Sequence, residues 1–226
     1  MARLLIIDTA LEEAIVAISN EGKIIAELSN KEAHSHASFI QVAIEKLLEA
    51  QNMVIKDIDA IAVTLGPGSY TGLRVGLATA KGIAYAIQKP IIGLSTLSAL
   101  AHKAVKFAST LTTDEFQVFP MIDARRMEIF GSIHKPSLDL ILPEQAIVLD
   151  QTQWNKLITK PTICIGNGTA KTKDFTSLFE VSYQDGRYTS IDLLEMASEK
   201  LKNSQFEDLA YVSPNYLKEV YIIPSK

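Results

Sequence analysis

The sequence predicts an α/β protein made of two tandem lobes, each with a mixed sheet. Three observations predict this fold class. The 226 residues suffice for one large domain or two small ones. The first half has the pattern of three strands followed by alternating helices and strands, and a similar order begins again after residue 115. Finally, LLIIDTALEEAIVAI and VFPMIDARRMEIFGSI share an apolar strand, Ile-Asp, a polar turn and a second apolar strand. We interpret the match as an internal duplication.

The first half justifies this pattern element by element. The run 4–7 is apolar and ends at Asp8, which is typical of a buried strand. The turn 20–22 predicts a hairpin. From Ile40, apolar residues recur at helical spacing. The predicted elements are strands at 4–7, 14–19 and 23–28, a helix at 37–50, a strand at 60–64, a helix from the loop 66–72 to residue 87, a strand at 91–94 and a helix from Ser95 to about residue 107.

The second half repeats the opening strands and then becomes less regular. The predicted elements are strands at 116–122, 127–133 and 145–149, a short helix around Trp154, a strand at 162–165 and helices near 170–179 and 191–201. The polar segment STLTTDE at 109–115 separates the halves. We therefore expect domains at 1–109 and 110–226.

Composition excludes several classes of protein. The net charge is −4, which gives no support to a standalone nucleic-acid binder, because such proteins need a basic face. The single cysteine, Cys164, excludes an internal disulfide framework and a cysteine-based zinc cluster. No uncharged apolar run reaches about 18 residues, so we expect no membrane span. The apolar segment before Asp8 is too short for a signal peptide. We expect a soluble cytoplasmic protein with no membrane association.

The loop GPGSYTG at 66–72 is rich in glycine, but it matches neither phosphate-binding fingerprint. Leu73 and Arg74 stand where a P-loop needs Lys and Ser or Thr, and the glycine spacing is one residue too long for a dinucleotide site. The loop favours a tight strand-to-helix turn. The alternative is an anion held at the helix N-terminus, with Arg74 in the first turn.

The helix after this loop is apolar or small around most of its circumference. Its small residues recur every four positions, at Gly72, Gly76, Ala80 and Ala84. On the helix 37–50, Phe39 and Val42 lie away from the apolar face. Both helices are therefore either buried within one chain or form a docking surface for another.

Histidines give no metal-binding pattern. His34 and His36 are spaced H-x-H, whereas two histidines that share one ion on a helix usually stand four residues apart. His102 and His134 are distant in the sequence. We expect no metal site.

Five stretches together resemble the TsaB (YeaZ) family: IDTALEEAIVAI, HSHASFIQVAIEKLL, DAIAVTLGPGSYTGLRVGLATAKGIA, IDARRMEIF and SPNYLKE. The resemblance implies a two-lobed actin/Hsp70-type (ASKHA) fold of RNase H-like lobes, the second one reduced. It also implies a non-catalytic subunit that acts with TsaD and the ATPase TsaE. These proteins install threonylcarbamoyl on the adenosine next to the anticodon, in tRNAs that read codons beginning with A.

The resemblance also implies site residues and partners. The catalytic relative TsaD carries two metal-binding histidines, and Thr96 and Leu100 stand at these positions here. The implied partners are TsaD as a heterodimer, TsaE, tRNA through the complex, and a second copy when the chain is alone. The implied partner-interface residues lie on the two helices at 35–50 and 71–87: His36, Phe39, Val42, Lys46, Gly72, Leu73, Gly76 and Ala80.

Two acids leave a second function open. In actin-like ATPases, the place of Asp8 and Thr9 holds the metal-nucleotide phosphates, and Asp123 occupies the matching place in the second half. A lone Asp at a strand end is more often a turn former. The alternative to the scaffold is thus an actin-fold ATPase or small-molecule kinase that uses Asp8 and Asp123. We expect no cofactor, with weak ATP or ADP binding at most at a composite interface.

Overall fold

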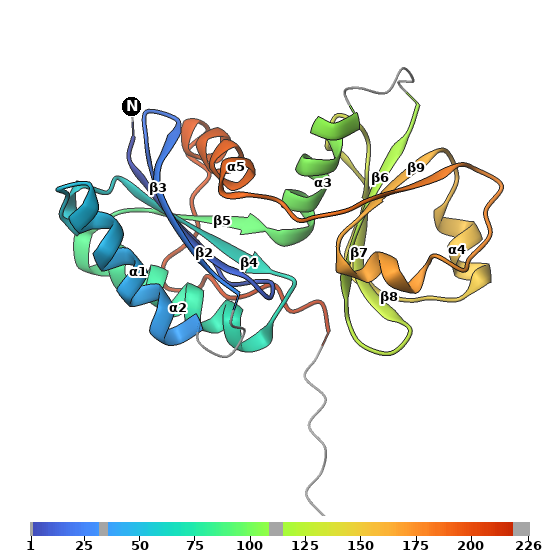
Figure 1. The fold of residues 1–226 in the computed structure, drawn as a ribbon, viewed down its shortest axis with the longest axis horizontal. Coiled ribbons are helices and arrows are strands. Elements are labelled where there is room, and N and C mark those ends of the chain that lie inside the picture. The colour runs from blue at the N-terminus through green and yellow to red at the C-terminus, as the bar shows by residue number, and fades with distance from the viewer. Residues whose placement is uncertain (1, 32–35, 109–114, 219–226) are drawn as a thin grey trace, which may run out of the picture. The chain divides into compact units, whose positions relative to one another are not determined.

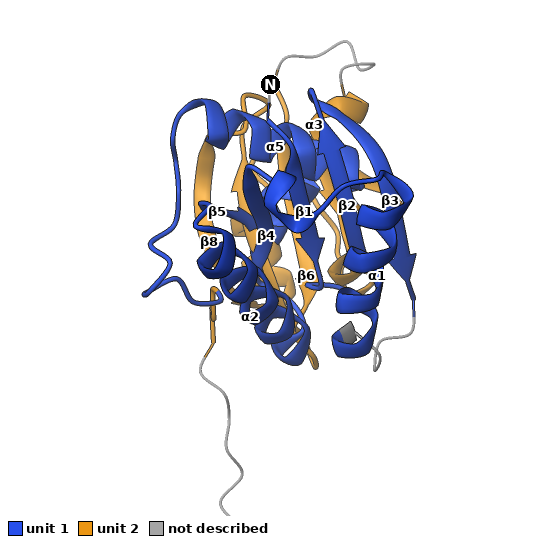
Figure 2. Ribbon diagram, turned by 90° about the vertical axis from the view of Figure 1, so that its left-hand side faces the viewer, with its two compact units in different colours: residues 1–103, 188–214 blue, residues 104–187, 215–226 orange. Residues whose placement is uncertain are grey.

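The computed structural model describes residues 2–31, 36–108 and 115–218, and these form two compact units (Figure 2). Unit 1 comprises Met1–Lys103 and Tyr188–Pro214, and unit 2 comprises Ala104–Arg187 and Asn215–Lys226. This division differs from the predicted one at 109/110, because the chain returns to unit 1 after residue 187. The returning segment is fastened by hydrogen bonds: Lys200 Nζ donates to the Gly93 carbonyl at 2.7 Å, and the Glu207 amide donates to the Ile91 carbonyl at 2.9 Å.

Unit 1 is built on a five-stranded mixed sheet in the order β3-β2-β1-β4-β5. The central strand β1 is buried along its whole length, pairs antiparallel with β2 and parallel with β4, and β4 pairs parallel with β5. Strand bounds agree closely with the sequence prediction. They are β1 Leu4–Asp8, β2 Ala14–Asn20, β3 Lys23–Asn30, β4 Ala60–Gly66 and β5 Ile91–Ser95.

Helices cover both faces of this sheet. Figure 1 shows α1 (His36–Ala50) and α2 (Tyr70–Ile87) together on one face, and α5 (Ser190–Lys202) on the other. A short 3₁₀ turn, η1 (Ile55–Asp57), precedes β4, and α3 (Thr96–Ala108) passes from unit 1 into unit 2 after Lys103. The inward residues of α1 are the predicted ones: Ile40, Ala43, Ile44, Leu47 and Leu48.

Unit 2 repeats the strand order of unit 1. Its sheet runs β8-β7-β6-β9-β10, with β6 antiparallel to β7 and parallel to β9, just as β1 pairs with β2 and β4. The predicted duplication is therefore confirmed in the topology. The bounds are β6 Gln117–Asp123, β7 Glu128–His134, β8 Leu140–Val148, β9 Thr162–Ile165 and β10 Val181–Gln184. Only α4 (Gln151–Leu157) and the 3₁₀ helix η2 (Asn167–Lys171) lie wholly within the described part of unit 2.

One predicted helix is wrong. Residues 170 and 171 end the 3₁₀ helix η2 instead, and turns follow it, where the Thr172 hydroxyl donates to the Thr169 carbonyl at 2.9 Å. Phe175 then packs on the ring of Trp154, with centroids 5.8 Å apart. The four-residue strand β10 follows, which sequence alternation was too short to reveal. Strand β8 also begins five residues before the predicted start.

None of the helices formed by the described residues is long and apolar enough to cross a membrane.

Candidate functional site

The two sides of α2 have opposite environments. On the inner side, Gly72 and Gly76 press against the residues that follow β1, and a Cβ atom at either position would collide with Thr9. The Thr9 hydroxyl donates a hydrogen bond to the Gly72 carbonyl at 2.7 Å, which locks this close approach. Leu73 and Ala80 are buried on the same side.

The structure therefore corrects half of the predicted partner interface. Gly72, Leu73, Gly76 and Ala80 face the core of unit 1 and are not available to another chain. A row of small residues shows that two backbones approach closely, but it does not show which backbone is the second one. Here it is the chain's own segment after β1.

The outer side of α2 is the exposed one, and the helix α1 lies beside α2 (Figure 2). Ala78 and Gly82 are open to solvent, and apart from the adjoining backbone of α2, no atom of the described residues lies within 4 Å of the place where a Gly82 Cβ would stand. Tyr85 is 79% exposed and Val42 of α1 is 47% exposed. We call this surface, formed by Val42, Lys46, Arg74, Ala78, Gly82 and Tyr85, the outer α1/α2 face.

The remaining predicted residues of α1 divide between the two environments. Val42 and Lys46 are exposed on the outer α1/α2 face. Helical spacing predicts Phe39 away from the apolar face, but it is half-buried and packs against the core of unit 1. His36 begins α1, but its side chain lies outside the described residues. Sequence reasoning missed Ala78 and Gly82, although they repeat at the same spacing of four as the buried row.

The glycine-rich loop is a tight turn, as the sequence favoured. Ser69 caps α2, and its hydroxyl accepts from the Gly72 amide at 3.2 Å. The Ser69 amide donates to the Ala10 carbonyl at 2.7 Å, so the loop is bound to the segment after β1. Arg74 contacts the loop itself, because its guanidinium carbon lies 4.0 Å from the ring centre of Tyr70. This is a cation–π contact.

Asp8 and Thr9 serve structure within unit 1. Both are completely buried. One carboxylate oxygen of Asp8 accepts from the Thr64 hydroxyl at 2.8 Å and from the Ala10 amide at 3.0 Å, which joins β1 to β4 and fixes the turn after β1. Both bonds agree with the interpretation of Asp8 as a turn former.

Asp123 is instead exposed at the end of β6 in unit 2. Its carboxylate accepts from Lys171 Nζ at 2.7 Å and from the Arg125 amide at 2.6 Å. Partial burial raises the pKa of Asp123, but these hydrogen bonds and the Lys171 charge outweigh it and lower the pKa below its usual value. Asp8 and Asp123 thus belong to different units, and each is bonded within its own.

Thr96 and Leu100, the two residues that the resemblance sets against the TsaD histidines, are buried in α3. A leucine side chain cannot ligate a metal, and a threonine hydroxyl is a poor ligand for a transition metal. The described residues nevertheless bring together one histidine with two carboxylates elsewhere in unit 1: His102, Asp192 and Glu195.

Two sheets of the same strand order, each with parallel and antiparallel pairs, define the class: an α/β protein of two similar lobes, the second with shorter helices. The solved structure of YeaZ from Pseudomonas aeruginosa has this fold, with a TM-score of 0.80 and 24% identity over 96% of this chain and all of that one. The family model for TsaD, tRNA N6-adenosine threonylcarbamoyltransferase, matches residues 23–221. The chain belongs to this family, on its TsaB (YeaZ) branch.

Curated relatives identify this branch. The tRNA threonylcarbamoyladenosine biosynthesis protein TsaB of Escherichia coli is 28% identical over 96% of this chain and 94% of its own length. TsaB of Bacillus subtilis is 29% identical over 74% of this chain and 72% of its own length. The transferase of Anaplasma marginale matches a shorter part, with 36% identity over 42% of this chain and 32% of its own length.

Proposed function

We propose that this chain is the non-catalytic partner subunit of a TsaD-type transferase, and that it docks on the transferase through the outer α1/α2 face. With a TsaE-type ATPase, the two subunits would transfer threonylcarbamoyl to the adenosine next to the anticodon, in tRNAs reading codons that begin with A. Full-length similarity to TsaB proteins supports this role. The chain would reach tRNA through the complex and act in the cytoplasm.

The observation that carries the proposal is the composition of the outer α1/α2 face. Tyrosine and arginine are enriched where protein interfaces bind most strongly, and Tyr85 and Arg74 stand on this surface. Between them, Ala78 and Gly82 leave a low ridge that lets a partner helix approach closely, because the distance between packed helices depends on the side chains at the contact. The same face would pair two copies when the chain is alone.

The absence of catalysis is supported by side-chain chemistry. Thr96 and Leu100 cannot supply the transferase metal site, and Asp8 is buried and bonded to Thr64 and Ala10. A catalytic role would need metal ligands or an available carboxylate at the end of β1 or at the start of α3. We therefore assign the chemistry to the TsaD-type partner.

The test is a charge placed on the low ridge. Ala78→Glu would bury an unpaired carboxylate in the complex, at a cost of several kcal/mol, while the free chain keeps it in water. We expect a folded protein by circular dichroism, capture of the TsaD homologue weakened at least about tenfold, since about 1.4 kcal/mol already gives that factor, and a matching loss of tRNA modification in the reconstituted assay.

Ile191→Glu is the matched control. Ile191 is 55% exposed on α5, which covers the opposite face of the sheet, so this variant should bind and support modification as the unchanged chain does. A folded Ala78→Glu variant that captures TsaD with unchanged affinity would refute the outer α1/α2 face. Modification that proceeds equally well without this chain would refute the subunit role itself.

A further inference from the structure

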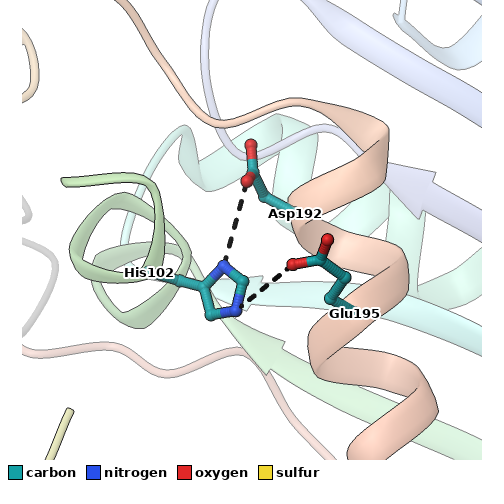
Figure 3. A group of neighbouring side chains, drawn as sticks. All are labelled: His102, Asp192 and Glu195. Atoms are coloured by element: carbon teal, nitrogen blue, oxygen red, sulfur yellow. Dashed lines mark ion pairs between the residues drawn. The ribbon is translucent and has the colours of Figure 1, made fainter. Parts of the chain in front are cut away.

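His102, Asp192 and Glu195 meet at the contact between two helices that are far apart in the sequence. His102 lies on α3, and both acids lie on α5, one turn apart (Figure 3). One donor atom from each of the three residues lies within 4.8 Å of the other two. The ring nitrogens of His102 approach the acids individually: Nδ1 is 3.8 Å from Asp192 Oδ1, and Nε2 is 3.5 Å from Glu195 Oε2. All three residues belong to unit 1.

The nitrogen His102 Nδ1 is the informative atom of this cluster. It is buried and has no hydrogen-bond partner among the residues that the structure describes. Its distance of 3.8 Å to Asp192 is too long for a hydrogen bond, which for nitrogen and oxygen spans about 2.7–3.2 Å. A distance of this size suits two ligands of one ion, because metal bonds of about 2.0–2.2 Å hold their donor atoms roughly 3–4 Å apart.

Hydrogen bonds with Thr189, the residue before α5, fix the orientation of the Asp192 carboxylate. Its second oxygen, Oδ2, accepts from the Thr189 amide at 2.8 Å and from the Thr189 hydroxyl at 2.9 Å. These bonds form the capping box of α5 and turn Oδ1 toward His102. Hydrogen bonds that fix the unused atom of a ligand are the usual support of protein metal sites.

We propose that His102, Asp192 and Glu195 form a binding site for a divalent transition-metal ion of the zinc class. The donor set of one imidazole nitrogen and two carboxylate oxygens suits Zn²⁺, whereas Mg²⁺ and Ca²⁺ prefer oxygen ligands throughout. A divalent ion also balances the charge of the two carboxylates. Three protein ligands leave a further coordination position for water. Solvent can reach this position beside Glu195, because the Glu195 side chain is 45% exposed.

The site differs from that of the transferases, whose ligand positions here are Thr96 and Leu100. It also departs from the expectation of no metal, which rested on the lack of ligand spacing along the chain. The ion would bind α5 to α3 and so fasten the returning segment 188–214 to the first part of unit 1. Its role is structural, and it adds to the proposed subunit function without depending on it.

Calorimetric titration of the full chain with ZnCl₂, after treatment with a chelator, tests the proposal. We expect one site per chain that depends on His102, and a rise of the thermal midpoint when Zn²⁺ is present, because the ion binds the folded form. MgCl₂ should give neither signal. Replacing one ligand, in His102→Ala or Glu195→Gln, should weaken Zn²⁺ binding by at least about tenfold. Changing a residue that only hydrogen-bonds to a metal ligand already lowers metal affinity by about tenfold or more.

Glu199→Gln is the matched control, since Glu199 is exposed one turn further along α5 and should bind Zn²⁺ as the unchanged chain does. Should His102→Ala unfold, the exposed Glu195→Gln variant still decides the question, with circular dichroism as the check of folding. Equal Zn²⁺ binding by Glu195→Gln and the unchanged chain would overturn the site, as would Zn²⁺ bound only at other histidines. No binding by the unchanged chain would leave His102 as an ion-pair partner of the two acids and overturn the proposal.

Discussion

In unit 1 the five-stranded sheet is covered by helices of 13 to 18 residues, whereas in unit 2 a sheet of the same order has an α-helix of seven residues and a 3₁₀ turn. The cores differ accordingly. Unit 1 buries many aliphatic side chains from strands and helices. Unit 2 fills its smaller core around Trp154, whose ring stacks on Phe119 with centroids 6.2 Å apart. The comparison shows that the same sheet order can enclose a core with long helices in one unit and with a large central aromatic side chain in the other.

The largest effect is expected from removing that side chain. Trp154 is completely buried, so Trp154→Ala should lower the free energy of unfolding of unit 2 by about 3–5 kcal/mol, from lost burial and the cavity left behind. Urea denaturation followed by circular dichroism measures the change. Phe179→Ala, at a 41% exposed position, is the control and should cost far less. A loss below about 1 kcal/mol for Trp154→Ala would contradict this account of the core.

The matching aspartates at the strand ends sharpen the comparison. Asp8→Ala should destabilise unit 1, because it leaves the Thr64 hydroxyl and the Ala10 amide buried without a partner, at about 1–3 kcal/mol for each. Asp123→Ala breaks an ion pair in which Asp123 is 42% exposed, and such pairs contribute about 0–1 kcal/mol. Thermal denaturation of both variants checks the order. Equal losses of stability in the two variants would contradict the different roles assigned to Asp8 and Asp123.

Gly76 and Gly82 test the two sides of α2 with the same substitution. Gly76→Ala should cost about 1–3 kcal/mol, because the new methyl group collides with Thr9. Gly82→Ala should stabilise the protein by about 0.5–1 kcal/mol, because its Cβ meets open space and alanine favours the helix. Chemical denaturation gives both values. The same sign for both variants would be incompatible with one buried and one exposed side.

The smallest effect concerns pH and unit 2. Burial lowers the pKa of His134 on β7, although a hydrogen bond with the Leu138 carbonyl raises it in part, and the matching strand β2 has no histidine. A lowered pKa means that the unfolded chain binds a proton that the folded one does not. Stability should therefore fall as pH drops below about 6.5, by at most about 1.4 kcal/mol per pH unit.

Urea denaturation of the unchanged chain and of His134→Gln between about pH 7.5 and pH 5.5, on either side of the ordinary histidine pKa, measures this slope. The variant should lose the part of the slope that His134 contributes. If both proteins show the same dependence on pH, other groups are responsible.

Local patterns predicted most of the fold, and their limits are physical. Apolar runs and helical spacing located every strand and α-helix of unit 1, although not the 3₁₀ turn η1, because the apolar residues of these elements are buried in one core. The patterns failed at 170–184, where contacts of Phe175 and Tyr183 with residues distant in the sequence decide the structure. They also failed for the face of α2, since the buried and exposed rows have the same spacing. Asp192 could not be placed beside His102 without the fold.

The return of residues 188–214 to unit 1 has a consequence for synthesis of the chain. Strand β5 is an edge of its sheet, and its Ile91 pairs with Glu207 in an isolated antiparallel bridge. A ribosome synthesises the chain from its N-terminus. The edge of β5 therefore stays without Glu207 until more than a hundred residues beyond residue 103 have been synthesised. The continuous stretch 104–187 can complete its own sheet during that interval. Unit 2, most of which is synthesised after residues 1–103, can therefore complete its sheet before unit 1 is complete.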